Sequence, residues 1–249
     1  MPVILVLLVI VPLVAVTASA VLPRRAAEVG TAVSGVVVLA LSITLVPAVS
    51  EHTVAAGPYL RADALSVVFL LATGFLYAVT AVFSIGYHAQ EARVAAADPE
   101  QAAEFARYCR RFNLGLNVFA WSLVCAPLVN GLALLWVAVE ITTVVSALLV
   151  ALDDTERAAE AAWKYVLIAS SGLGVALLAT IVMYYAGAQT LGQSYDLAFD
   201  PLLGVAARLP STAVQLALVL AVVGFGMKVG LVPITAGVVR AHGCCDLRR

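Results

Sequence analysis

Charge is scarce in this sequence. Only 12% of its 249 residues are Asp, Glu, Lys or Arg, and 63% are hydrophobic, whereas a soluble domain is roughly half apolar and about a quarter charged. The mean hydropathy is +1.04. A core of this size cannot hide so much apolar surface from water, so the composition excludes an ordinary soluble domain and predicts a protein surrounded by lipid. No basic patch is interleaved with aromatic residues, so nucleic acid is not an expected partner.

Cysteine is also rare, and its four positions do not suggest a disulfide framework. Cys125 lies in an apolar run, Cys109 in a charged segment, and the other two are adjacent near the C-terminus. The spacing there matches no zinc pattern, although four possible ligands stand close together: His242, Cys244, Cys245 and Asp246. Neither a cluster-binding cysteine pattern nor a haem motif is present. We therefore expect no metal site, no cofactor and no catalytic residue.

The N-terminal segment resembles a signal peptide only in its Ala18-Ser19-Ala20 sequence. It lacks a positively charged start, and its apolar run is long enough to cross a bilayer. Two arginines, Arg24 and Arg25, follow this run. The pattern predicts a retained helix whose N-terminus lies outside the cell.

The sequence predicts an all-α polytopic membrane bundle with about seven transmembrane helices, since a crossing needs about 20 apolar residues. The expected spans are 2–22, 29–49, 63–87, 112–131, 132–151, 163–186 and 211–237. Asn130-Gly131 is a turn signal between the fourth and fifth spans. The charged segment 88–111 is expected to be partly a surface helix. The segment 187–210 is either an interfacial stretch or a solvated loop.

The arginines between these spans predict the orientation. Arginine is enriched on the side that the chain reaches after the first span: Arg24, Arg25, Arg93, Arg107, Arg110, Arg111, Arg157, Arg240, Arg248 and Arg249. Only Arg61 and Arg208 fall on the other side. Because cytoplasmic loops carry the excess of positive charge, we expect a multi-pass inner-membrane protein with its N-terminus outside and its C-terminus in the cytoplasm.

Three ionisable residues lie in apolar surroundings: Glu140, Lys164 and Lys228. A charge at the bilayer centre costs about 2.5–3.5 kcal/mol on insertion scales, and such residues usually mark an ion path. Lys164 alternatively extends its amine to the interface. Glu140 and Lys228 alternatively form a structural ion pair, although a buried pair stabilises less well than apolar packing.

Hydroxyl and small residues surround these charges. The hydroxyls are Thr142, Thr143 and Ser146, within two turns of Glu140, and Ser171, two turns after Lys164. They are suited to holding water beside a charge. The helix-breaking residues around Lys228 are Gly224, Gly226, Gly230 and Pro233. Because proline has no amide hydrogen, the carbonyl of Val229 should lack its helical partner. We expect a broken seventh helix between 224 and 233, which lines a cavity.

At these motifs the chain resembles the proton-conducting antiporter-like subunits of respiratory complex I, of group 4 membrane-bound hydrogenases and of Mrp-type antiporters. The motifs are the runs 136–150, 163–165 and 224–233, and the first is most similar to the hydrogenase-associated branch. The resemblance implies that Glu140 pairs with Lys228 on a broken seventh helix. It also implies a role in proton transfer for Lys164.

The resemblance is strong from about residue 60 to 233 and implies one membrane domain over 1–249. Residues 1–111 would form a peripheral three-helix part with a cytoplasmic loop, and 112–249 an incomplete first inverted repeat. The family pattern is lost after 233, so the chain resembles a truncated or split subunit.

The expected function is that of a proton-translocating membrane subunit in a redox-driven complex, similar to hydrogenase-4 or NADH-quinone oxidoreductase. Its partners would be the lipid bilayer and other membrane subunits, which would carry the oxidoreductase chemistry. Two alternatives stay open. One is an Mrp-type subunit that exchanges Na⁺ for protons. The other is a truncated membrane scaffold that transports nothing.

Overall fold

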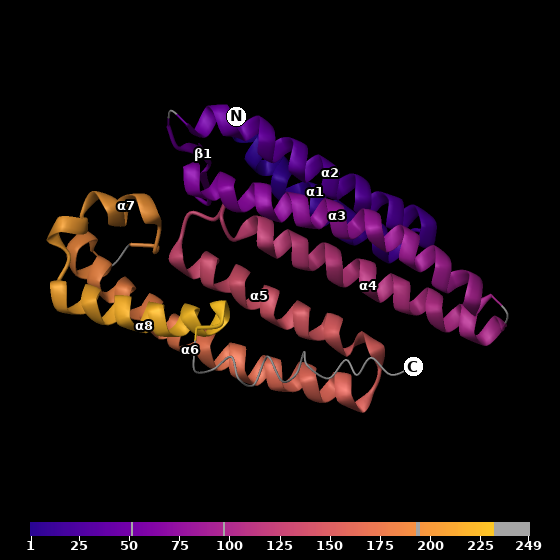
Figure 1. Cartoon of the computed structure of the whole chain (residues 1–249). Coiled ribbons are helices and arrows are strands. Elements are labelled where there is room, and N and C mark those ends of the chain that lie inside the picture. Colours follow the sequence, from indigo (N-terminus) through magenta and orange to yellow (C-terminus); the bar gives the residue numbers. More distant parts are fainter. Residues whose placement is uncertain (51, 97, 193–194, 232–249) are drawn as a thin grey trace. The chain divides into compact units, whose positions relative to one another are not determined.

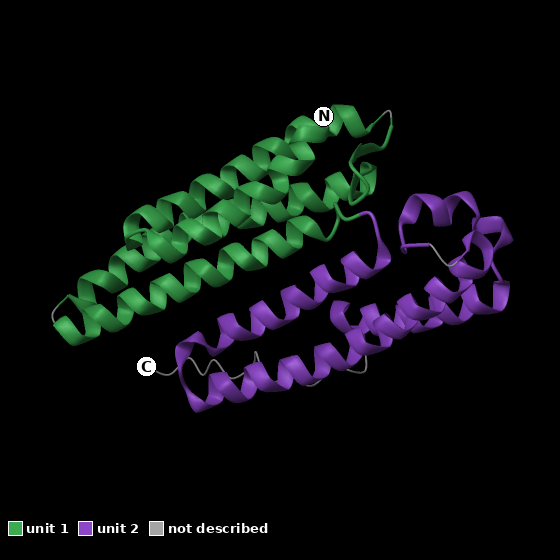
Figure 2. Cartoon of the chain, turned by 180° about the vertical axis from the view of Figure 1, so that it is seen from behind, with its two compact units in different colours: residues 1–129 green, residues 130–249 purple. Residues whose placement is uncertain are grey.

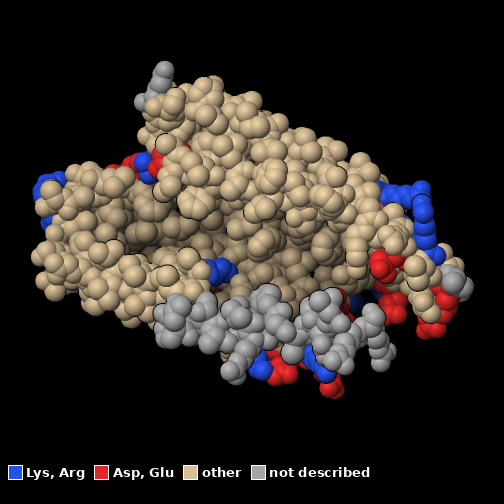
Figure 3. All heavy atoms as spheres, in the orientation of Figure 1, with Lys and Arg blue, Asp and Glu red and all other residues tan. Residues whose placement is uncertain are grey.

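The computed structural model describes the chain apart from residues 51, 97, 193–194 and 232–249. It is helical except for one short hairpin, and six of its described helices are long and apolar enough to cross a membrane. The predicted all-α polytopic membrane bundle is thereby confirmed. The helices form two compact units, residues 1–129 and 130–249 (Figure 2). On the face that Figure 3 shows, the charged side chains of the described residues lie in small groups on an otherwise uncharged surface.

Unit 1 (residues 1–129) is a bundle of four helices with a β-hairpin (Figure 1). Its elements are α1 (Pro2–Val21), α2 (Arg24–Val49), β1 (Val54–Ala56), β2 (Leu60–Ala62), α3 (Ala64–Ala95) and α4 (Pro99–Cys125). α1 packs against α2 and α4, and α3 packs against the same two helices. Their apolar faces meet in a core that includes Leu5, Val38, Leu70 and Val124.

Side-chain caps fix where two of these helices begin. Asp63 accepts a hydrogen bond from the Ser66 amide (2.9 Å) at the start of α3. Asp98 accepts one from the Glu100 amide (3.0 Å) at the start of α4, where Pro99 is the first helical residue. Both arrangements satisfy amides that have no partner within the helix.

The described part of unit 2 (residues 130–249) contains three long helices and short connecting ones. They are α5 (Leu132–Val150), η1 (Ala151–Asp153), α6 (Glu156–Leu191), α7 (Phe199–Gly204), η2 (Ala206–Arg208) and α8 (Ser211–Val229). α6 packs against both α5 and α8. The segment 187–210 is not a plain solvated loop, because it holds α7 and η2 and buries Tyr195 and Leu202 against Gly187.

The fourth expected span, 112–131, differs from the observed helix. α4 ends at Cys125, and its apolar part begins only at Phe112, so this part is shorter than the roughly 20 residues of a crossing. The segment 88–111, where a surface helix was expected, contains the C-terminal end of α3 and the N-terminal part of α4. Because α4 packs on α1 and α3, it belongs to unit 1, although the sequence suggested a division after residue 111.

The break in the last described helix begins later than expected. α8 is regular through Gly224 and Gly226 and ends at Val229, where Gly230 is left-handed (φ 87°). The amides of Gly230 and Leu231 both donate to the Gly226 carbonyl, at 3.0 and 2.9 Å. Pro233, which would leave the Val229 carbonyl without its helical partner, lies outside the described residues.

Candidate functional site

Glu140 lies half-buried in the middle of α5. The Ser170 hydroxyl of α6 donates to its Oε1 at 2.8 Å. Its other oxygen, Oε2, is buried and has no hydrogen-bond partner in the described part of the chain. Since a buried acceptor without a partner is unfavourable, this oxygen is well suited to take a proton or to accept a bond from water.

Lys228 lies in the last turn of α8 and extends its amine between two hydroxyls. Its Nζ donates to Thr143 Oγ1 on α5 at 2.5 Å and to the Tyr165 hydroxyl on α6 at 3.3 Å. The amine is also 5.7 Å from the centre of the Tyr165 ring, a distance at which the ring face attracts a cation. The ammonium of one helix is thus held by the two others.

Glu140, Thr143 and Ser146 follow one another at a spacing of three along α5, so they share one face of the helix. The Ser146 hydroxyl lies 3.2 Å from the Tyr165 hydroxyl. We call the six side chains of this cluster the polar group of unit 2: Glu140, Thr143, Ser146, Tyr165, Ser170 and Lys228. Their hydrogen bonds form two sets, Glu140 with Ser170, and Lys228 with Thr143, Tyr165 and Ser146. Each hydroxyl in them can both donate and accept.

Glu140 and Lys228 do not form a direct ion pair in this structure, since the salt bridges between described residues do not include them. They are connected instead through α5, where Thr143 contacts Lys228 one turn after Glu140. This arrangement separates the two charges by hydroxyls that can reorient.

The three helices of the polar group are held by close contacts. The Trp136 indole of α5 donates to the Leu173 carbonyl of α6 at 2.7 Å. Between α6 and α8, a Cβ on Gly224 would lie only 2.4 Å from the Ala176 nitrogen. Small residues of this kind let membrane helices approach closely, and the approach brings Lys228 within reach of α5.

Several predicted residues lie elsewhere. Lys164 is about 60% exposed and pairs with Glu160 one turn earlier on α6. Ser171 is exposed, and its hydroxyl donates to the Ile168 carbonyl. Thr142 donates to the Val139 carbonyl at 2.6 Å, so its hydroxyl bonds within its own helix.

Two members of the polar group were missed, Tyr165 and Ser170. Each lies one residue away from a predicted one, and a step of one residue turns a helix by about 100°. The sequence signal that could have found them is the pair of hydroxyl residues Tyr165 and Ser170 on α6. Tyr165 lies at the level of Thr143, and Ser170 lies at the level of Glu140.

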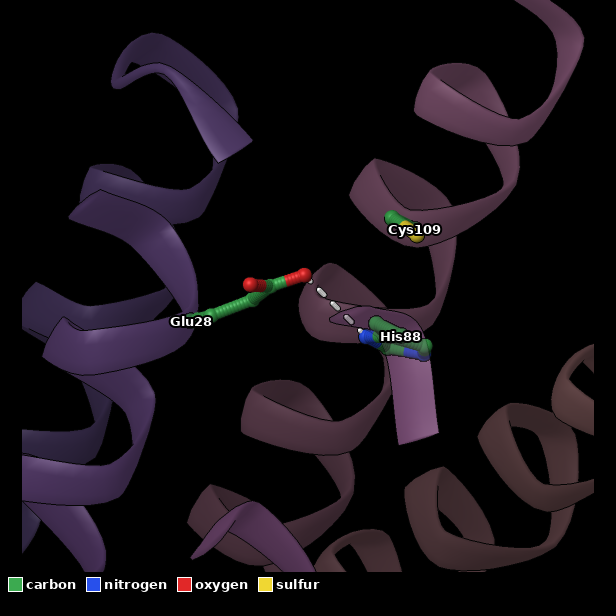
Figure 4. A group of neighbouring side chains, drawn as sticks. All are labelled: Glu28, His88 and Cys109. Carbon is green, nitrogen blue, oxygen red and sulfur yellow. Dashed lines mark hydrogen bonds and ion pairs between the residues drawn. The ribbon is translucent and has the colours of Figure 1, made fainter. Parts of the chain in front are cut away.

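Unit 1 holds a second buried polar cluster, shown in Figure 4. His88 Nδ1 lies 3.2 Å from Glu28 Oε1, with the two residues 2% and 4% exposed. With Cys109, their donor atoms lie within 4.8 Å of one another, a set that Zn²⁺ can accept. The carboxylate, however, already has His88 and the Arg24 guanidinium (3.9 Å) as partners. We interpret the cluster as a structural contact between α2, α3 and α4.

Asn117 of α4 connects all four helices of unit 1. Its amide nitrogen donates to Ser19 on α1 (2.8 Å) and to Thr31 on α2 (2.9 Å). Its amide oxygen accepts from the Tyr77 hydroxyl on α3. Asn117 is fully buried, and such a satisfied network fixes how helices pack.

The sequence is similar to proteins of energy-converting membranes. The family model for the transmembrane region of NADH:quinone oxidoreductase and Mrp antiporter proteins matches residues 129–243. A hydrogenase-4 component F homolog from Methylacidiphilum infernorum (isolate V4) is 30% identical over 187 residues, which are 75% of this chain and 38% of the relative.

The fold is similar to that of a chain in the membrane-bound sulfane sulfur reductase, an archaeal respiratory membrane complex. The TM-score is 0.69 at 19% sequence identity, over 97% of this chain and 48% of the other. At this identity the likeness concerns the fold alone. This chain therefore spans less than half the length of both relatives.

Proposed function

We propose that this chain, which is similar to the antiporter-like family of membrane subunits, moves protons across the bilayer within a redox-driven complex. The observation that supports this most directly is the polar group of unit 2. It joins a carboxylate with one unpartnered oxygen to an ammonium held by two hydroxyls. Such groups inside a membrane bundle usually mark a proton path.

In the proposed mechanism, Glu140 and Lys228 hold the transferred protons, and the hydroxyls near them reorient to connect one to the other. A nearby carboxylate raises the affinity of a lysine for its proton, and loss of that negative charge lowers it. Protonation of Glu140 would therefore promote release of a proton from Lys228. Thr143 and Tyr165 are the contacts through which the amine would pass it on.

The proposed partners are the lipid bilayer and the other membrane subunits of a complex similar to hydrogenase-4 or to NADH-quinone oxidoreductase. Those subunits would carry the electron-transfer chemistry. The matched family also includes Mrp antiporters, so exchange of Na⁺ for protons is the second candidate function. Transport in vesicles with and without Na⁺ distinguishes the two, since only the antiporter requires Na⁺.

We also propose that α4 crosses the bilayer, with its charged N-terminal part in the cytoplasm. Its apolar part, residues 112–125, extends about 21 Å, which leaves about 9 Å of the roughly 30 Å of hydrocarbon to the last charged turn before it and the apolar residues after it. If α4 crosses, the excess of arginine on the cytoplasmic side places residue 100 inside and residue 128 outside. Reporters inserted near residues 100 and 128 should respond on opposite sides of the membrane, and a reporter near residue 55 should respond on the same side as the one near 128. A response on one side from residues 100 and 128 would refute this topology.

The test of function is proton pumping by the complete complex in inverted membrane vesicles. Glu140→Gln and Lys228→Ala should each lower pumping by on the order of a hundredfold, the range expected for proton-transferring groups, at normal abundance in the membrane. Lys164→Gln is the matched control, because this lysine is exposed and lies outside the polar group; it should keep pumping.

The double variant Glu140→Gln with Lys228→Met distinguishes transport from a structural role. If the two charges only stabilised the fold, removing both would restore pumping, because no orphaned charge would remain. Full pumping by the double variant would overturn the proposal. If all variants and the unaltered chain failed to pump in an assembled complex, the chain would be a scaffold.

A further inference from the structure

Unit 1 contains a pocket of about 270 Å³ that the proposed proton path does not use. It lies between the end of α1, the start of α2 and the middle of α4. Its lining residues are Ser19, Leu22, Arg24, Ala27, Ala106, Arg107, Arg110 and Asn113. Three of them are arginines and none is acidic, so the pocket is electrically suited to an anion.

The two arginines of α4 are available to bind a ligand. Arg107 and Arg110 are exposed, and neither takes part in an ion pair in the part of the chain that the structure describes. Of the three arginines, Arg24 alone forms an ion pair among the described residues, with Glu28 at 3.9 Å. Arginine guanidinium groups bind phosphate oxygens through paired hydrogen bonds, which a single lysine cannot make.

A buried acceptor lies among the lining residues. Asn113 is 1% exposed, and its amide nitrogen donates to the Cys109 carbonyl at 2.9 Å. Its oxygen, Oδ1, is buried and has no donor within the described ranges. An anion alone would not satisfy this acceptor. A ligand that also carries a hydroxyl would, because the hydroxyl can donate a hydrogen bond.

The pocket lies at the level where the helices leave the apolar region. The apolar run of α1 ends at Val21, and α4 changes from charged to apolar between Arg111 and Phe112. Val21 and Leu22 are exposed beside the pocket, so acyl chains can lie along α1 while a headgroup sits above them. Basic pockets at this depth are typical sites for anionic lipids.

We propose that this pocket binds one anionic glycerophospholipid whose headgroup carries a hydroxyl, such as phosphatidylglycerol. Arg107 and Arg110 hold the phosphate, Arg24 adds positive charge, and the headgroup hydroxyl donates to Asn113. The lipid thereby connects α1, α2 and α4 at one end of unit 1. The site is independent of Glu140 and Lys228, so it can be tested even where transport is lost.

The experiment is native mass spectrometry of the purified complex in detergent, with phosphatidylglycerol added at increasing concentration. Phosphatidylmethanol has the same charge without the hydroxyl, and phosphatidylcholine has no net charge. We expect occupancy to fall in the order phosphatidylglycerol, phosphatidylmethanol, phosphatidylcholine. Equal occupancy by all three lipids would overturn the proposal.

Variants locate the site. Arg107→Gln combined with Arg110→Gln should weaken phosphatidylglycerol binding by about tenfold or more, since each basic residue near a lipid surface contributes to binding. Arg93→Gln removes an exposed positive charge from α3 outside the pocket and should weaken binding much less than the double variant does. If Arg93→Gln weakened binding as much as the double variant, the attraction would be general and the proposal wrong.

Asn113→Ala tests the hydroxyl. It should remove the preference for phosphatidylglycerol over phosphatidylmethanol and leave the preference of both over phosphatidylcholine. If this variant does not fold, the lipid ranking in the unaltered chain still tests the same point. Inorganic phosphate and glycerol phosphate at millimolar concentration form the last arm. Displacement of the lipid by these soluble anions at millimolar concentration would identify a site for a soluble anion and overturn the lipid assignment.

Discussion

The two units bury polar side chains in different surroundings. In unit 1, Asn117 bonds to side chains of α1, α2 and α3 and is fully buried. In unit 2, Glu140 accepts one bond from Ser170 and keeps a second, unpartnered oxygen, while Lys228 is only half-buried. The hydrogen bonds of Asn117 are satisfied and should stay as they are. The polar group of unit 2 contains donors and acceptors that can exchange partners.

Burial of a charged side chain therefore does not by itself indicate transport. Glu28 is more buried than Glu140, but its Oε1 faces two basic side chains, His88 and Arg24. Glu140 accepts a hydrogen bond from the Ser170 hydroxyl alone among the described residues, and its Oε2 is buried without a partner. A carboxylate held by basic side chains fixes the packing of helices. The kind of partner, more than the depth, separates the structural glutamate from the proposed proton carrier.

Matched substitutions of these two glutamates should give opposite results, and this is the largest effect that we expect. Glu140→Gln should lower proton pumping on the order of a hundredfold with little change in thermal stability. Glu28→Gln should cost about 2–3 kcal/mol of stability by removing the charged partner of His88, while pumping per assembled complex is retained. Pumping assays and melting curves on the same preparations measure both. Loss of pumping by stable Glu28→Gln protein would contradict the distinction between the units.

Asn117 should be the most sensitive uncharged position of unit 1. Asn117→Ala removes contacts to three helices, and at about 0.6–1 kcal/mol for each interhelical hydrogen bond the unfolding free energy should fall by about 2–3 kcal/mol. That corresponds to a fall in melting temperature of about 4–12 °C for a chain of this size. Ser122→Ala on the same helix is the control, since that hydroxyl bonds only to its own helix. Equal melting temperatures for the two variants would show that the network adds no stability.

The close approach of α6 and α8 predicts a difference between two glycines of unit 2. Gly224→Ala places a methyl group 2.4 Å from the Ala176 nitrogen, and such overpacking typically costs about 1–3 kcal/mol. Because α8 carries Lys228, pumping should fall as well. Gly174→Ala meets nothing within 4 Å and should be neutral or stabilising, since alanine favours helix. A stable, active Gly224→Ala variant would mean that α8 can shift without disturbing the polar group.

The sequence predicts the helical membrane fold and the main charged residues of the site, because both depend on composition and on isolated charges in apolar runs. It predicts contacts between helices less well. The hydroxyls that surround Glu140 and Lys228 depend on the rotation of α6, and a one-residue error replaces Tyr165 by Lys164. The extent of α4 was wrong for a related reason: apolar length alone does not show that its helix begins in the charged segment at Pro99.

The smallest effect that we expect comes from two neighbouring serines of α6, which separate the observed site from the one expected from sequence. Ser170→Ala removes the hydroxyl that donates to Glu140 at 2.8 Å. A hydrogen bond to a charged group is worth about 1.5 kcal/mol or more in a dry site and less beside water, so pumping should fall about threefold to tenfold. Ser171→Ala removes a hydroxyl that faces outward and bonds to its own helix, so it should leave pumping unchanged. Pumping rates of the two variants at equal abundance show which serine acts on Glu140. A larger loss from Ser171→Ala would mean that α6 is rotated in the working complex and that the side chains facing Glu140 are those expected from the sequence.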